Sequence, residues 1–121
     1  MNATTGTVFL VDDDARVLKA MSRLLGSEGW STRSYQSGRA FLADYDGAEP
    51  GCLVLDLLMP EMSGLEVQRE LGRLGDHRPI IFLSGRGDVP SSVSAMKSGA
   101  ADFLTKPVDG EILLASSMMP F

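Results

Sequence analysis

The sequence has one cysteine, one histidine and no long hydrophobic run. A single cysteine excludes an intrachain disulfide, and Cys52 lies in an apolar stretch, where we expect a small buried hydrophobe rather than a nucleophile. No apolar run approaches the ~20 residues that a membrane-spanning helix needs. Residues 1–6 contain no basic region followed by an apolar stretch. We therefore expect a cytoplasmic protein without a signal peptide or a membrane partner.

Basic residues are also few, since 11 Lys and Arg stand against 16 Asp and Glu, for a net charge of −5. Nucleic acids are held through clusters of Lys and Arg, so we expect no direct nucleic acid binding by this segment. A length of 121 residues with 44% hydrophobic content is typical of one globular domain. Near the end of the sequence, Pro120 cannot continue a helix.

Short apolar runs alternate with helical patterns along the chain. Continuous runs predict strands buried on both faces of a parallel sheet, and a more alternating segment predicts an edge strand. The buried runs are residues 8–11, 53–55, 80–83 and 103–105, and the edge candidate is 30–35. This alternation predicts a three-layer α/β sandwich with right-handed crossovers.

Five helices are predicted between and after these runs. The first helix stops near Gly29, and its apolar face consists of Val17, Leu18, Met21, Leu24 and Leu25. The second helix starts at Ser37 and contains Phe41, Leu42 and Tyr45. The third helix begins with a capping box formed by Ser63 and Glu66, and its inward residues are Leu65, Leu71 and Leu74. The fourth begins near Pro90, and a fifth, short one near Asp109.

Polar residues follow four of the predicted strands: Asp12, Asp13, Asp56, Ser84 and Lys106. Ligands of such sheets bind outside the carboxyl ends of the strands, so these side chains should converge on one pocket. Clustered carboxylates repel one another, and Mg²⁺ with its preference for oxygen ligands would compensate them. Lys106 adds a positive charge and Ser84 a hydroxyl donor, which completes a set suited to phosphoryl transfer. Alternatively, Asp13 or Asp14 caps the next helix.

The residues resemble the receiver domain of bacterial two-component response regulators. The matching motifs are LVDD at 10–13, DLLMPEMSG at 56–64, SG at 84–85 and DFLTKP at 102–107. The resemblance covers a core of about residues 7–115 and leaves 116–121 as an atypical tail. It implies a flavodoxin-like five-stranded parallel sheet of order 2-1-3-4-5. Further motifs, GRGDVP at 85–90 and AMKSGA at 95–100, look like the regulators of nitrogen fixation and styrene degradation, which carry a helix-turn-helix output domain.

The resemblance implies a role for each matching residue. Asp56 would be the phosphoacceptor, and Asp12 and Asp13 the acidic pair that binds Mg²⁺ together with Asp56 and the backbone carbonyl of Leu58. Lys106 would contact Asp56 or the phosphoryl group, ahead of a cis bond to Pro107. Ser84 and Phe103 would form the switch pair, Pro60 and Gly64 would be structural, and Val93, Met96 and Lys97 would line a partner or dimer surface.

These roles imply a signalling domain rather than an enzyme. A sensor histidine kinase would phosphorylate Asp56, and the modified form would favour a homodimer and control a transcriptional output elsewhere in a longer protein. Three alternatives are a stand-alone receiver that acts through protein contacts, a receiver that no longer needs phosphorylation, and an aspartyl-phosphate phosphatase of the haloacid dehalogenase type. The last needs a second Asp at position 58, where this chain has Leu58. An apolar Leu58 also predicts a long phosphoryl lifetime.

Overall fold

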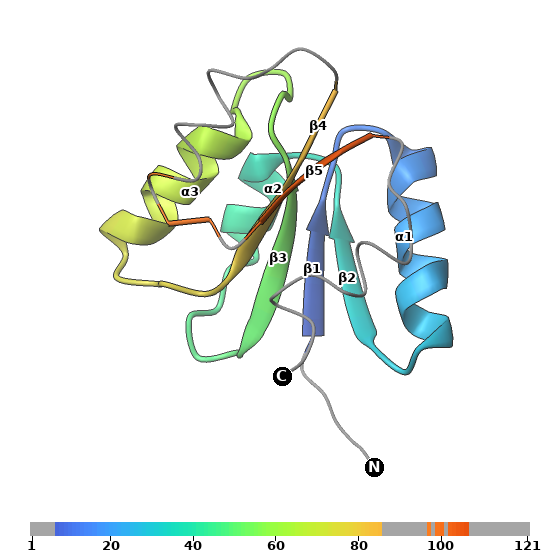
Figure 1. The fold of residues 1–121 in the computed structure, drawn as a ribbon. Coiled ribbons are helices and arrows are strands. Elements are labelled where there is room, and N and C mark those ends of the chain that lie inside the picture. The colour runs from blue at the N-terminus through green and yellow to red at the C-terminus, as the bar shows by residue number, and fades with distance from the viewer. Residues whose placement is uncertain (1–6, 86–96, 98, 101, 107–121) are drawn as a thin grey trace.

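The computed structural model describes residues 7–85, 97, 99–100 and 102–106. Five parallel strands form one sheet of order β2-β1-β3-β4-β5 (Figure 1). The strands are β1 (Thr7–Val11), β2 (Ser31–Tyr35), β3 (Gly51–Asp56), β4 (Ile80–Ser84) and β5 (Asp102–Thr105). The strand order and all five predicted strand positions are confirmed.

Three helices lie in the described part of the chain: α1 (Ala15–Ser27), α2 (Gly38–Ala43) and α3 (Gly64–Arg73). Helix α1 covers one face of the sheet, and α2 and α3 cover the other (Figure 1). The helices predicted from Pro90 and Asp109, and the tail at 116–121, lie outside the described residues. No helix of the described part is long and apolar enough to cross a membrane.

Local capping explains where two of these helices begin. The side chain of Asp14 accepts a hydrogen bond from the backbone N–H of Arg16 at 2.9 Å and caps α1, as the capping alternative predicted. The capping box of α3 is confirmed, because Ser63 Oγ accepts from the Glu66 N–H at 3.2 Å and Glu66 Oε1 accepts from the Ser63 N–H at 2.9 Å. This box fixes the helix that follows β3.

Two details of the predicted helices are wrong. Helix α2 ends at Ala43, so Tyr45 lies beyond it. Leu74 follows the last residue of α3 and is 53% exposed instead of pointing inward. The periodic pattern does not mark where a helix ends. Leu71 is buried as predicted, and Val67, which the pattern did not single out, is buried beside it.

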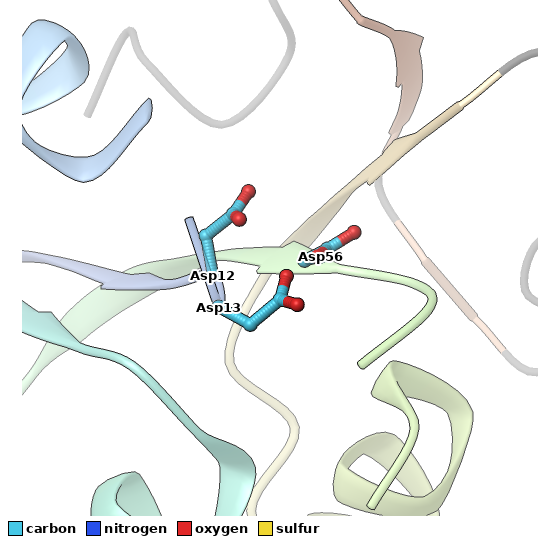
Figure 2. Close-up of side chains that lie close together, drawn as sticks. All are labelled: Asp12, Asp13 and Asp56. Carbon is cyan, nitrogen blue, oxygen red and sulfur yellow. The ribbon is translucent and has the colours of Figure 1, made fainter. Parts of the chain in front are cut away.

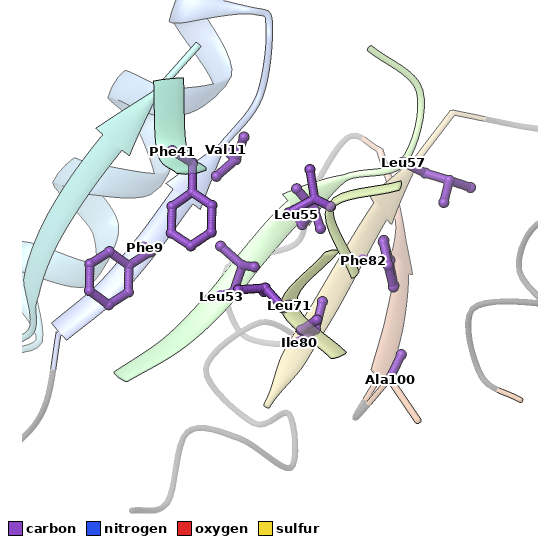
Figure 3. Packing of buried hydrophobic residues seen from close by; sticks show 11 residues of the cluster. Phe9, Val11, Phe41, Leu53, Leu55, Leu57, Leu71, Ile80, Phe82 and Ala100 are labelled. Carbon is purple, nitrogen blue, oxygen red and sulfur yellow. The ribbon is translucent and has the colours of Figure 1, made fainter. Parts of the chain in front are cut away.

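The core is divided by the sheet into two clusters. One lies under α1 and includes Leu18, Leu25 and Cys52, and the other lies under α2 and α3 (Figure 3). Strands β1, β3 and β4 are almost wholly buried, as expected for a sheet covered on both faces. Cys52 is fully buried and burial raises the pKa of its thiol to about 12, which confirms it as a small hydrophobe.

Candidate functional site

Three carboxylates meet at the carboxyl edge of the sheet. Asp12 and Asp13 directly follow β1, and Asp56 is the last residue of β3. Strands β1 and β3 are neighbours with Val11 opposite Leu55, so their next residues lie side by side. One oxygen from each carboxylate lies within 4.8 Å of the others, and Figure 2 shows the three side chains close together. Asp12 is fully buried, Asp56 is 3% exposed and Asp13 is exposed.

The two carboxylate oxygens of Asp12 differ in their partners. Oδ1 accepts a hydrogen bond from the backbone N–H of Asp14 at 2.9 Å, which fixes the carboxylate to the start of α1. Oδ2 is buried and accepts no hydrogen bond from any described residue. The Nζ of Lys106 lies 2.9 Å from Oδ2, an ion-pair contact without hydrogen-bond direction. Oδ2 is therefore the oxygen with capacity for a further ligand.

Lys106 and Ser84 complete the pocket from the two following strands. Lys106 Nζ lies 3.4 Å from Asp56 Oδ1, so the expected pair with Asp56 is present, but Asp12 is the nearer partner. The backbone N–H of Lys106 donates to the Ser84 carbonyl at 2.8 Å and ties the ends of β4 and β5 together. Ser84 is buried, and its Oγ donates to the Gly85 carbonyl at 2.8 Å.

The charges of this pocket do not balance. Burial raises the pKa of Asp56 to about 7, together with the negative charge of Asp12 and the neighbouring carboxyl of Asp13, whereas Lys106 opposes this shift. Burial by itself would lower the pKa of Lys106, but the Asp12 and Asp56 carboxylates outweigh it and raise that pKa. Among the described residues, one ammonium group faces three carboxylates, so a divalent cation with oxygen ligands fits this donor set.

The loop between β3 and α3 is held close to the site by a glycine. The Gly64 N–H donates to the Leu57 carbonyl at 2.8 Å. A Cβ at Gly64 would lie 2.5 Å from the backbone oxygen of Asp56, so only glycine permits this approach. Within the loop Pro60 is exposed, and Leu58, two residues after Asp56, is 60% exposed.

The remaining predicted site residues are Phe103 and Lys97, which the structure describes, and three residues outside the described chain. Phe103 on β5 is half-buried, with its ring centroid 6.4 Å from that of Phe82. Lys97 is exposed. Pro107, Val93 and Met96 lie outside the described residues, so the cis bond and most of the partner surface stay predictions.

The sequence did not indicate that Asp14 orients Asp12 through its backbone, or that Lys106 lies nearer to Asp12 than to Asp56. Both facts depend on side-chain rotamers. The only signal in the sequence was the run of three aspartates at the end of β1.

The fold and this acidic pocket define a receiver of the two-component type. The sequence matches the response regulator receiver domain over residues 8–117, and the chain belongs to this family of phosphorylation-activated signalling domains. Among solved structures, the crystal structure of FixJ-N superposes with a TM-score of 0.85 at 42% identity, covering 92% of this chain and 89% of that one. The response regulator StyR gives 0.86 at 42% identity, covering 92% and 56%.

Two curated relatives contain such a domain as part of a longer chain. The chain is 50% identical over 116 residues to the response regulator protein TmoT of Ectopseudomonas mendocina, covering 96% of this chain and 53% of TmoT. It is 43% identical over 111 residues to the transcriptional regulatory protein FixJ of Rhizobium meliloti, covering 92% and 54%. The chain thus spans about half the length of the curated relatives it matches.

Proposed function

We propose that Asp56 is the phosphoacceptor of this receiver and that the pocket around it carries out a Mg²⁺-dependent phosphoryl transfer. The observation that carries the proposal is the buried Asp56 carboxylate at the end of β3, within one cluster with Asp12 and Asp13 and 3.4 Å from Lys106. A buried carboxylate with this surrounding charge has a reactive oxygen and the groups that neutralise an incoming phosphoryl group.

Asp12, Asp13 and Asp56 would hold the Mg²⁺, and the resemblance adds the backbone carbonyl of Leu58. The fit is supported by Asp12 Oδ2, which accepts no hydrogen bond from the described residues, and by the excess of carboxylates over ammonium groups among them. When bound, the cation supplies charge neutralisation to the phosphoryl oxygens and to the carboxylates. Asp13, which is exposed, offers its carboxylate from the solvent side of the cluster.

The donor is expected to be the phosphohistidine of a sensor histidine kinase, as in the family. An Asp56 carboxylate oxygen attacks phosphorus in line, the phosphorus–oxygen bond forms as the phosphorus–nitrogen bond breaks, and the histidine nitrogen leaves with the bonding pair. The Lys106 ammonium then pairs with a phosphoryl oxygen in place of Asp56 Oδ1. This exchange keeps the positive charge within the same pocket.

The output would start at Ser84 and Phe103. Ser84 Oγ now donates to the Gly85 carbonyl, and turning it towards a phosphoryl oxygen would break that bond and release the end of β4. Phe103 then moves into the vacated space and shifts an equilibrium between two states of the surface that includes Val93, Met96 and Lys97. We infer a phosphorylation-dependent homodimer through this surface and, because relatives such as FixJ are transcriptional regulators, a transcriptional output.

The test is the intact mass of the protein after incubation with acetyl phosphate and MgCl₂. We expect one phosphoryl adduct in the wild type, none in Asp56→Asn, and none in the wild type with EDTA. Size-exclusion chromatography of the same samples tests the dimer. An adduct that persists in Asp56→Asn would overturn the assignment, and the absence of any adduct from the wild type would support a receiver that no longer needs phosphorylation.

A further inference from the structure

We propose that Lys106 competes with the divalent cation for Asp12, so that removing its ammonium group increases the affinity of the empty pocket for the cation. The inference rests on the proposed function, because the cation is the one bound by that site. It concerns a different property, however, namely how a residue of the unphosphorylated pocket lowers the affinity of that pocket for the cation. The contacts of the Asp12 carboxylate carry the argument.

The two oxygens of the Asp12 carboxylate differ in how open they are to a cation. Its Oδ1 accepts the Asp14 N–H at 2.9 Å, and Asp14 is itself fixed because its side chain caps α1 through the Arg16 N–H. Rotating the Asp12 carboxylate would leave a backbone donor at the helix start without its acceptor, which is unfavourable. Oδ2, the buried oxygen that accepts no hydrogen bond from the described residues, is therefore the more open ligand for a cation.

The same oxygen is the nearest ion-pair partner of Lys106, at 2.9 Å. An ammonium group and a divalent cation on one carboxylate oxygen would repel each other strongly, because this part of the pocket is buried and poorly screened. Binding of the cation therefore requires the ammonium to leave Asp12. Breaking the contact between Lys106 and Asp12 costs free energy, and this cost lowers the apparent affinity of the pocket for the cation.

Lys106 has a second position within reach. Its backbone is held by the hydrogen bond from its N–H to the Ser84 carbonyl at 2.8 Å, and its Nζ already lies 3.4 Å from Asp56 Oδ1. A small displacement moves the ammonium from Asp12 to Asp56. Binding of the cation would thus place the Lys106 ammonium next to the Asp56 oxygen that receives the phosphoryl group. Without the cation, the same ammonium would balance part of the negative charge of the pocket.

The experiment measures cation binding to the unphosphorylated protein by isothermal titration calorimetry with MgCl₂, and by water-proton relaxation with MnCl₂. Lys106→Met keeps the length of the side chain and removes the charge, and we expect it to bind either cation about five-fold more tightly or better. Lys106→Arg keeps a positive charge and should remain near the wild type. Lys19→Met is the matched control, because Lys19 is exposed on α1 and its removal changes the net charge equally.

An unchanged or weaker affinity in Lys106→Met, or an equal gain in Lys19→Met, would overturn the inference. If the wild type still forms the Asp56 adduct with MgCl₂ in that case, the proposed function stands and only the competition is wrong. If no variant binds Mg²⁺ and no adduct forms, both fail. Circular dichroism melting curves identify an unfolded variant, and Lys106→Gln then takes the place of Lys106→Met in the same titrations.

Discussion

Two buried charged clusters lie at opposite edges of the same sheet, and they are built differently. At the carboxyl edge three carboxylates share one ammonium group, Lys106, and Asp12 Oδ2 has no hydrogen bond among the described residues. At the amino edge, just before β4, Arg78 and Asp76 form a pair with side chains only 7% and 11% exposed. Asp12 and Asp56 are as deeply buried as this pair, but the charge balance of the two clusters differs.

The pair at the amino edge has many partners. Arg78 Nη2 lies 2.9 Å from Asp76 Oδ2 and also donates to the Glu49 carbonyl at 3.2 Å. The Tyr45 hydroxyl donates to the same Asp76 oxygen, and the guanidinium lies over the rings of Phe9 and Tyr45 at 5.2 and 5.5 Å. Burial would raise the pKa of Asp76, but the hydrogen bonds from Arg78 and Tyr45 outweigh it and lower that pKa to about 2.

The comparison distinguishes buried charges that connect parts of the fold from buried charges that are suited to binding and reaction. The amino-edge pair joins the segment after α2 to the segment after α3, and each charge is compensated there. The carboxyl-edge pocket carries an excess of negative charge, which costs stability and is consistent with the proposed binding of a cation and a phosphoryl group at Asp56. The pKa of Asp76 is lowered to about 2 and the pKa of Asp56 is raised to about 7, which reflects this difference in charge balance.

The largest expected effect is on the amino-edge pair. Arg78→Met leaves the Asp76 carboxylate buried without its cation, and we expect the free energy of unfolding in urea to fall by about 3–5 kcal/mol. The control is Arg73→Met, because Arg73 pairs with Glu70 on the surface of α3 with 70% of its side chain exposed, and solvent screens such a pair so that its loss changes stability little. Equal losses in the two variants would show that burial does not distinguish these pairs.

An effect of opposite sign is expected at the carboxyl edge. The Asp56 pKa is raised from 3.8 to about 7, so its contribution to stability is present below pH 3.8 and is lost as the pH rises through about 7. We expect Asp56→Asn to increase the free energy of unfolding at pH 8 by about 1–3 kcal/mol. Urea unfolding from pH 4 to 8 without divalent cations measures it. A gain that does not grow with pH would contradict the charge imbalance.

The smallest effect on stability is expected at Leu58, which is exposed and lies two residues after Asp56. Leu58→Asn should change the free energy of unfolding by no more than about 0.5 kcal/mol, as is usual for a surface site. It should nevertheless shorten the lifetime of the phosphoryl group, because an amide can orient an attacking water and an apolar side chain cannot. The wild-type lifetime should exceed minutes. Decay of the phosphoryl adduct by intact mass checks this, and an unchanged rate would contradict the role of Leu58.

The sequence predicted the carboxyl edge far better than the amino edge. Apolar runs of strand length, each followed by a polar residue, were enough to bring Asp12, Asp56 and Lys106 together, because parallel strands end at one edge. No such rule connects Tyr45 with Asp76, which lie 31 positions apart in loops whose paths depend on tertiary packing. The side-chain rotamer that brings Lys106 nearer to Asp12 also depends on tertiary packing, so the sequence could not predict it.

Gly64 has a consequence for how this protein can vary. Its hydrogen atom occupies space that no side chain can enter, because a Cβ would lie 2.5 Å from the Asp56 carbonyl and 3.0 Å from both Leu57 Cα and the Phe82 ring. Gly26 and Gly72, in contrast, have nothing within 4 Å of such an atom. In a saturation library the two open glycines would accept residues of many kinds. Position 64 would reject alanine as firmly as aspartate, since the selection there acts on volume and not on chemistry.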